Sequence, residues 1–357
     1  PGDDLIDWYE VAGVAMDIAG DDVEQLTTVP DGAAHEFEAY IREAIPVVAE
    51  YTGLTAASAL EAPVVFSREE WIAISAENMK PLLELLIVGF SKSVSSGQEV
   101  QLPNRFVRAA LSGELGLVLG YLGRRVLGQY DPGLLQPSGQ DGRVYFIYPN
   151  IVEAEARLGI EPRSFRLWLA LHEVTHGFEF EANPWIKKYI EDLIAEQNHY
   201  LETRMARQAP QPKEDDMDFD QLIKTFTGGV YRQMMSPDEN PVLAKIQSLM
   251  SVLEGYSEHV MEVTGSMLIE EAGAIGELID HARKNRHWIH RIVEKAIRLE
   301  VKMEQYKLGN IFIKNAVDAG GMELANKVWE GPTNMPTLTE LRQPELWVTR
   351  MLKRRSS

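Results

Sequence analysis

Apolar residues recur at helical spacing along almost the whole chain, and this periodicity restricts the fold more than any other feature. Only two short segments, residues 61–66 and 144–148, are rich in β-branched and aromatic residues and read as extended. From residue 152 onward nearly every segment has the pattern of a helix. The sequence therefore predicts an α+β fold that is mainly helical, with a minor β component.

Glycine, proline and capping residues mark where the predicted elements begin and end. The expected order is a helical region over 4–52 broken at 20 and 30–32, an extended segment 61–66, a helix that starts with a capping-box pattern at Ser67, a helix over 103–128, a loop over 130–143, a strand over 144–148, and later a helix over 242–263. We expect one domain over 1–357, divided into an N-terminal portion (1–150) and a metal-binding helical portion (151–357). Two prolines and an acidic run predict an exposed loop over 207–220.

Composition excludes several kinds of partner and site. The formal charge of −19 disfavours binding to nucleic acid or to an anionic membrane, because such a surface repels phosphate. The chain has no cysteine, so any metal must be held by His, Asp or Glu. No leader-like segment and no apolar stretch of membrane-spanning length is visible, and a cytoplasmic protein is expected. The sequence does not indicate an oligomeric state.

The segment Ser164–Phe180 contains the motif His172-Glu173-Val-Thr-His176. Its apolar residues fall at helical spacing, so we expect the motif on an amphipathic helix with both histidines on one face, a turn apart. Two neutral imidazoles that share a Zn²⁺ ion, with a carboxylate that takes a proton from water, are the parts of a hydrolytic zinc site. His172 and His176 are therefore the predicted ligands, and Glu173 is the predicted general base.

A catalytic zinc normally takes a third protein ligand, and a carboxylate on a second helix is a common solution. Glu254 is the favoured candidate, 254 − 176 = 78 residues after the second histidine, and Gly255 beside it permits a close approach of another group. Glu258, one turn further, is a candidate to hydrogen-bond the outer nitrogen of a ligand histidine. The alternatives for the third ligand are His259, Glu262 and Glu270-Glu271.

Several blocks along the chain are similar to those of a known family. They are Asp7-Trp8, Arg68–Trp71, Val126–Pro132, Pro149-Asn150, Phe165–His176, Pro184-Trp185, Leu253–Tyr256, Val260-Met261, Lys302–Tyr306 with Gly309, and Pro344–Arg350. On these blocks the chain resembles the zincin-like metallopeptidase family of predicted bacterial and archaeal hydrolases. One actinobacterial branch of that family is associated with deazaflavin coenzyme biosynthesis genes.

The resemblance implies a zincin-like fold and Glu254 as the third ligand. Two positions depart from the pattern: Glu179 stands where Gln is expected, and Glu262 where Asp is expected. Neither is an inferred ligand of the metal. The family supplies no substrate, so a peptide or a small amide remains the expected class.

The mechanism also needs a group that stabilises the oxyanion. The candidates are Tyr256, His287, His290 and Tyr306. Two other interpretations stay open: a non-catalytic scaffold or binding protein that keeps a zinc site, and an amidohydrolase that acts on a small molecule. A structural zinc would need a fourth ligand, which His259 or Glu258 could supply.

Overall fold

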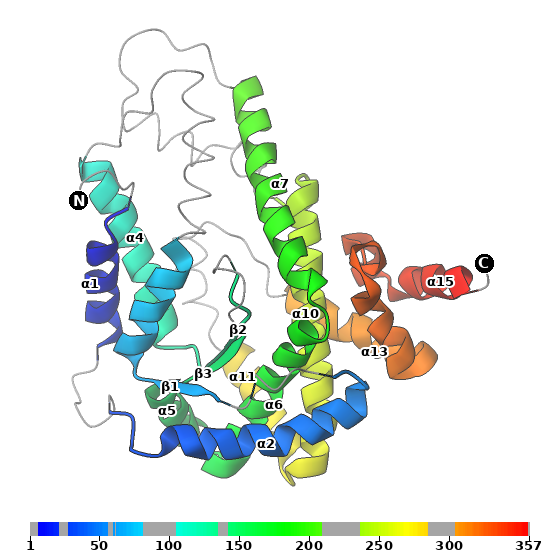
Figure 1. The fold of residues 1–357 in the computed structure, drawn as a ribbon, viewed down its shortest axis with the longest axis horizontal. Coiled ribbons are helices and arrows are strands. Elements are labelled where there is room, and N and C mark those ends of the chain that lie inside the picture. Colours follow the sequence, from blue (N-terminus) through cyan, green and yellow to red (C-terminus); the bar gives the residue numbers. More distant parts are fainter. Residues whose placement is uncertain are drawn as a thin grey trace.

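The computed structural model describes residues 6–20, 28–55, 60, 62–80, 105–134, 142–208, 236–284 and 304–355. Helices dominate it and one small sheet lies among them, which confirms the predicted mainly helical α+β class (Figure 1). The principal elements are α1 (Trp8–Ala19), α2 (Ala33–Thr52), β1 (Val64–Phe66), a helix over 68–80, α4 (Arg105–Gly123), β2 (Gly128–Asp131), β3 (Arg143–Ile147), α5 (Tyr148–Leu158), α6 (Pro162–Glu181), α7 (Trp185–Gln208), α10 (Pro241–Leu268), α11 (Ala272–Lys284), α13 (Glu304–Ala325), α14 (Leu338–Arg342) and α15 (Pro344–Arg355).

The sheet has three strands in the order β1-β3-β2. β1 is parallel to β3, with Val65 opposite Phe146, and β2 is antiparallel to β3, with Tyr130 opposite Val144. β2 corrects the prediction, which continued a helix to 128 and placed a loop from 130. Of its residues, Gly128 and Asp131 are of types depleted in strands and only Tyr130 is of a type enriched there, so pairing with β3 contributes more to this strand than local preference does.

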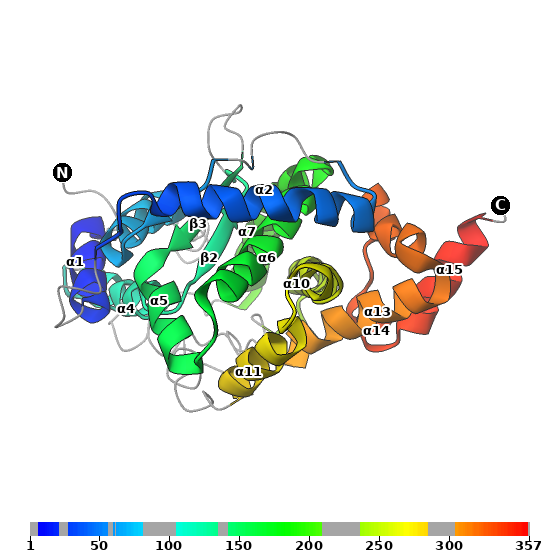
Figure 2. The ribbon, with the colours of Figure 1, turned by 90° about the horizontal axis from the view of Figure 1, so that it is seen from below.

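Helix α6 lies at the centre of the main core. It packs between α2 and α10 and also contacts β2 and β3 (Figure 2). The apolar stripe of α6 that the sequence predicts, Leu167, Leu171, Val174 and Phe178, is buried. Phe146 of β3 stacks on Phe37 of α2, with 4.2 Å between the ring centroids. The helix that bears the motif is thus surrounded by packed side chains.

A buried ion-pair network fixes the N-terminal half of α6. Arg166 donates to both carboxylate oxygens of Glu155 on α5, at 2.8 and 3.0 Å, and to Glu36 on α2 at 2.9 Å. Glu161 accepts from the backbone amides of Arg163 and Ser164 and caps the helix. Three helices are therefore joined near the start of α6 by charge-assisted hydrogen bonds.

A second, smaller core lies between α1, α4 and the helix over 68–80. A Cβ at Gly120 of α4 would lie 2.7 Å from the carbonyl oxygen of Ala15, so glycine permits the close crossing of α1 and α4. The predicted capping box at Ser67 is present, since Ser67 and Glu70 exchange hydrogen bonds. The buried Arg68 donates to Asn150 at the start of α5 at 2.6 Å, which ties this core to the sheet.

Helices α10 and α13 cross in backbone contact. A Cβ at Gly255 would lie 2.1 Å from the carbonyl carbon of Gly309, and one at Gly309 would lie 1.8 Å from the carbonyl oxygen of Ser251. The expectation that Gly255 permits a close approach is met, and the approaching group is the backbone of α13. In the C-terminal region Trp347 is fully buried and donates to the carbonyl oxygen of Asn334 at 2.7 Å.

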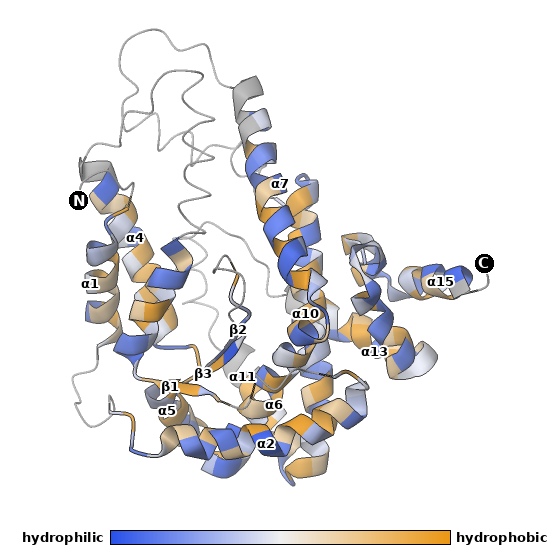
Figure 3. Ribbon diagram, in the orientation of Figure 1, coloured by the Kyte–Doolittle hydropathy of each residue, from blue (hydrophilic) through white to orange (hydrophobic). Residues whose placement is uncertain are grey.

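Most helices carry both hydrophilic and hydrophobic residues around their circumference (Figure 3). Among the described residues no helix has the length and the apolar character needed to cross a lipid bilayer. The loop predicted over 207–220 falls outside the described residues from 209 onward. The division into portions 1–150 and 151–357 stays a prediction.

Candidate metal centre

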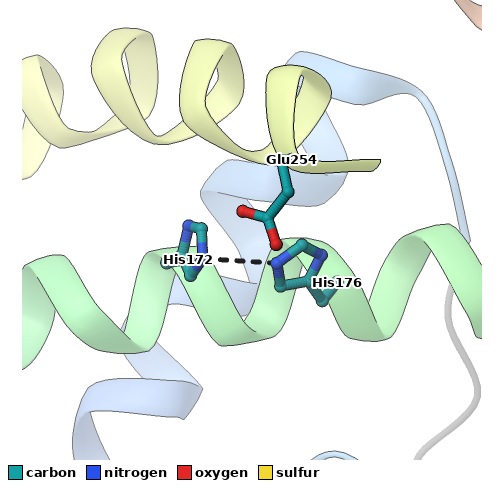
Figure 4. Close-up of side chains that lie close together, drawn as sticks. All are labelled: His172, His176 and Glu254. Carbon is teal, nitrogen blue, oxygen red and sulfur yellow. Dashed lines mark hydrogen bonds between the residues drawn. The ribbon is translucent and has the colours of Figure 1, made fainter. Parts of the chain in front are cut away.

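The two histidines of the motif project from one face of α6 toward α10 (Figure 4). Their Nε2 atoms lie 3.2 Å apart, and both side chains are half-buried. Two imidazole nitrogens at this separation can both direct a lone pair at one shared ion, provided that neither nitrogen carries a proton. The spacing of four residues on a helix produces this convergence without distortion.

Glu254 of α10 completes a group of three with His172 and His176, here called the triad. One ligand atom from each residue lies within 4.8 Å of the others. The other acidic candidates for a third ligand, Glu262, Glu270 and Glu271, are exposed. His259 is turned toward α2, where its Nε2 lies 2.8 Å from the hydroxyl of Tyr51. The structure thus brings together the set that the sequence favoured.

Glu179 holds the outer nitrogen of His176. Its carboxylate oxygen lies 2.8 Å from Nδ1, and the side chain is 0% exposed. A carboxylate in this position accepts the Nδ1 proton in a hydrogen bond, which leaves Nε2 as the nitrogen that would bind a metal ion. Burial alone would lower the pKa of His176, but Glu179, Glu254 and Glu173 together raise it well above its ordinary value.

Sequence reasoning proposed Glu258 for such an outer contact and did not assign Glu179. For His176 the structure gives the contact to Glu179, while Glu258 is half-buried one turn beyond Glu254. The signal was available, since His176 and Glu179 are three residues apart on one helix and such residues are neighbours. Glu179, which stands where the family pattern has Gln, therefore contacts the nitrogen of His176 that faces away from the triad.

Glu173 is almost fully buried beside the triad, against β2. A Cβ at Gly128 would lie 2.7 Å from its carboxylate oxygen, so glycine at this position makes room for the carboxylate. The backbone amide of Tyr130 donates to it. Burial and the nearby Glu254 carboxylate raise the pKa of Glu173 to about 7, against the opposing effects of His176 and of the Tyr130 amide. A carboxyl group with such a pKa can both accept and release a proton near neutral pH.

Of the oxyanion candidates, Tyr256 is fully buried, donates to Asn326 at 2.7 Å, and packs edge-on against Trp329. These contacts give it a role in the core. His287 and His290 lie outside the described residues, and Tyr306 belongs to α13 but its side chain is not described. Their roles stay predictions.

Two cavities meet at the triad. One, of about 380 Å³, extends between β2, α7 and α10 and contacts all three members of the triad; the other, of about 470 Å³, extends past His172 toward α4 and α5. Both are lined by Gly128, His172 and Glu173. A ligand that spans both cavities would pass directly over the motif.

Comparison with known proteins agrees with this geometry. A crystal structure described as that of "a putative hydrolase with a novel fold" from Chloroflexus aurantiacus is similar, with 29% sequence identity and a TM-score of 0.72. The match covers 97% of this chain and 98% of that one. No curated protein is significantly similar. The zincin-like metallopeptidase family matches residues 6–348, and the chain therefore belongs to that family.

Proposed function

We propose that the protein is a zinc-dependent hydrolase of amide bonds, with His172, His176 and Glu254 as the ligands of the ion. The observation that carries the proposal is the convergence of these three side chains within 4.8 Å. The donor set fits the metal, because Zn²⁺ in catalytic sites is held by imidazole nitrogens and a carboxylate. The contact from Glu179 to His176 supports the same assignment, since ligand histidines commonly donate their other N–H to a carboxylate.

In the proposed reaction Glu173 takes a proton from the attacking water and passes it to the leaving nitrogen. The C–O bond to water oxygen forms, the C–N bond breaks, and the products are a carboxylate and an amine. Zinc, when bound, supplies a Lewis acid that polarises the carbonyl group and lowers the pKa of water. The room left by Gly128 and the hydrogen bond from the Tyr130 amide support a position of the Glu173 carboxylate that suits this transfer.

The competing function is a scaffold that keeps zinc for structure. A structural zinc is closed by four protein ligands. Among the described residues the convergent group has three members, and Glu173 stands beside it rather than within it. His259, a candidate for the fourth ligand, is hydrogen-bonded to the hydroxyl of Tyr51. A three-residue group next to a buried carboxyl supports catalysis over a purely structural role.

Metal analysis together with anomalous scattering at the zinc edge tests the ligand assignment. We expect one zinc per chain, bound to His172, His176 and Glu254. Glu173→Gln should keep the zinc and lose hydrolysis of a quenched-fluorescence peptide library by roughly two to four orders of magnitude. Glu196→Gln, which removes the same charge from an exposed pair with Lys245, is the matched control and should keep both properties. Loss of zinc in Glu173→Gln would make Glu173 a ligand and overturn the mechanism.

A further inference from the structure

The two cavities that meet at the triad differ in chemical character. The 380 Å³ cavity between α7 and α10 is bounded mainly by apolar side chains, including Ile190, Leu193 and Leu249. The 470 Å³ cavity has Arg124, Arg125 and Arg157 in its wall. Both cavities are lined by His172 and Glu173, so a ligand that occupied both would contact these two side chains.

The arginines form a wall, here called the arginine wall, made of Arg124, Arg125 and Arg157. Arg124 and Arg125 follow the end of α4, and Arg157 lies in the last turn of α5. The guanidinium of Arg125 stacks 3.6 Å above the ring of Tyr121 and donates to the Tyr121 carbonyl oxygen, so its plane is held in place. A guanidinium held in this way retains further N–H donors for a planar carboxylate.

The same cavity is also lined by the carboxylate of Glu153, which is already paired with two arginines. One oxygen accepts from the buried Arg68 at 2.6 Å, and the other lies 3.8 Å from Arg157. Three arginines line this cavity, against two carboxyl groups, those of Glu153 and Glu173, among the described side chains. Positive charge therefore exceeds negative charge there, although the whole chain carries −19.

The charges of the arginine wall also act on one another. Burial lowers the pKa of Arg125, and the neighbouring Arg124 and Arg157 lower it further, with Tyr121 and Glu153 opposing them. An anion that binds between like charges this close relieves their mutual repulsion, so the arginine wall favours anion binding.

Resting on the proposed function, we propose that the substrate carries an apolar group on one side of the scissile amide and a carboxylate on the other. The apolar group occupies the cavity between α7 and α10, and the carboxylate binds the arginine wall. An N-acyl amino acid and the C-terminal end of a short peptide both present this chemistry. The arginine wall thus selects a free carboxylate and rejects its amide.

Direct binding to the metal-free, full-length chain tests the arginine wall without requiring hydrolysis. The probes are dansyl-phenylalanine and dansyl-phenylalaninamide, which differ in the carboxylate, and binding is followed by dansyl fluorescence. We expect the acid to bind at least about tenfold more tightly than the amide. Arg124→Gln and Arg157→Gln should each reduce this preference, and Arg157→Glu should remove it.

The matched control is Arg163→Gln, which removes the same charge from an exposed pair with Glu43 near the start of α6. It should leave the preference unchanged. Equal binding of the two probes to the wild-type protein would overturn the inference, and so would failure of both to bind. A preference that survives in Arg157→Glu would also overturn it, because the protonated histidines would then be its source.

Hydrolysis separates the two sources of carboxylate and distinguishes this inference from the proposed function. The zinc-loaded protein is assayed with N-octanoyl-phenylalanine and with benzyloxycarbonyl-leucyl-phenylalanine, each as free acid and as primary amide. The inference is supported if one or both acids have a lower KM than the matching amide and if Arg157→Gln raises that KM with little change in kcat. Which acid shows the lower KM identifies the source of the carboxylate. Equal cleavage of acid and amide keeps the proposed function and overturns the inference. No cleavage, with the dansyl acid still bound through the arginines, counts against the proposed function alone.

Discussion

The Nδ1 atom of His176 lies 2.8 Å from the carboxylate of Glu179, which is completely enclosed by protein. This contact orients the imidazole and increases its basicity toward a metal. Glu179→Gln should therefore weaken zinc binding by roughly 10- to 100-fold, because an amide oxygen is a weaker acceptor than a carboxylate. Competition with a chelator of known affinity measures the change.

Glu196→Gln serves as the control for Glu179→Gln, since it removes the same charge from an exposed pair with Lys245. Zinc affinity should be unchanged in that variant. A zinc affinity of Glu179→Gln equal to that of the wild type would show that the contact between Glu179 and His176 does not strengthen zinc binding.

Glu254 is the one member of the triad that comes from α10. Glu254→Ala should lower the zinc content to well below one ion per chain at limiting zinc, because two imidazoles alone form an incomplete site. Metal content after dialysis is the measurement. Glu262→Ala, at an exposed position of the same helix, should retain the ion, and retention by Glu254→Ala would assign the third ligand elsewhere.

The crossing of α10 and α13 at Gly255 and Gly309 leaves no room for a side chain. Gly255→Ala should destabilise the fold by about 1–3 kcal/mol, because the added methyl group forces the two backbones apart. Urea unfolding measures the loss. Gly276→Ala in α11 is the control: nothing lies within 4 Å of its Cβ position, so the helix should gain about 0.5–1 kcal/mol. An unchanged stability of Gly255→Ala would mean that the backbones of α10 and α13 are not in contact at this position.

The pair Glu340–Arg350 should make stability depend on pH. Burial alone would raise the pKa of Glu340, but hydrogen bonds from Arg350 and from the Thr337 amide outweigh it, and the pKa lies below its ordinary value. A carboxyl whose pKa is lower in the folded state stabilises the fold above its unfolded-state pKa, and this contribution is lost as pH falls through the folded-state pKa.

Glu340→Gln isolates that contribution, since glutamine preserves the capping box with Thr337 while removing the charge. The variant should be less stable than wild type by on the order of 1 kcal/mol near pH 7. The difference should shrink toward zero as the pH is lowered below about 4. Unfolding curves across this range measure it, and a difference that is constant with pH would exclude the ion pair as its cause.

Local pattern predicted those features that depend on neighbours in sequence. The helix that bears His172 and His176, the capping box at Ser67 and the strand before Pro149 all follow from spacing and end signals, and the structure contains them. Glu254 was favoured from its helix and from family resemblance together. Sequence could not show that its carboxylate reaches the histidines, because that depends on the packing of α10 on α6.

The features that sequence missed depend on contacts between distant segments. β2 becomes a strand because β3 lies beside it, and Gly128 and Tyr130 reach Glu173 only through that pairing. The excess positive charge in the 470 Å³ cavity is also a product of folding, since residues 124, 125 and 157 are brought together from the end of α4 and from α5. The total charge of the chain points the opposite way.

The location of the triad across two helices has a mechanical consequence. His176 and Glu254 are 254 − 176 = 78 residues apart, so an ion shared by them closes a long loop in the manner of a cross-link. Such a closure restricts the unfolded chain far more than the folded one. An occupied centre would therefore join α6 to α10 and fix the width of the 380 Å³ cavity, which both helices line, so that the ion used for chemistry would also maintain the shape of the space that receives the apolar part of a substrate.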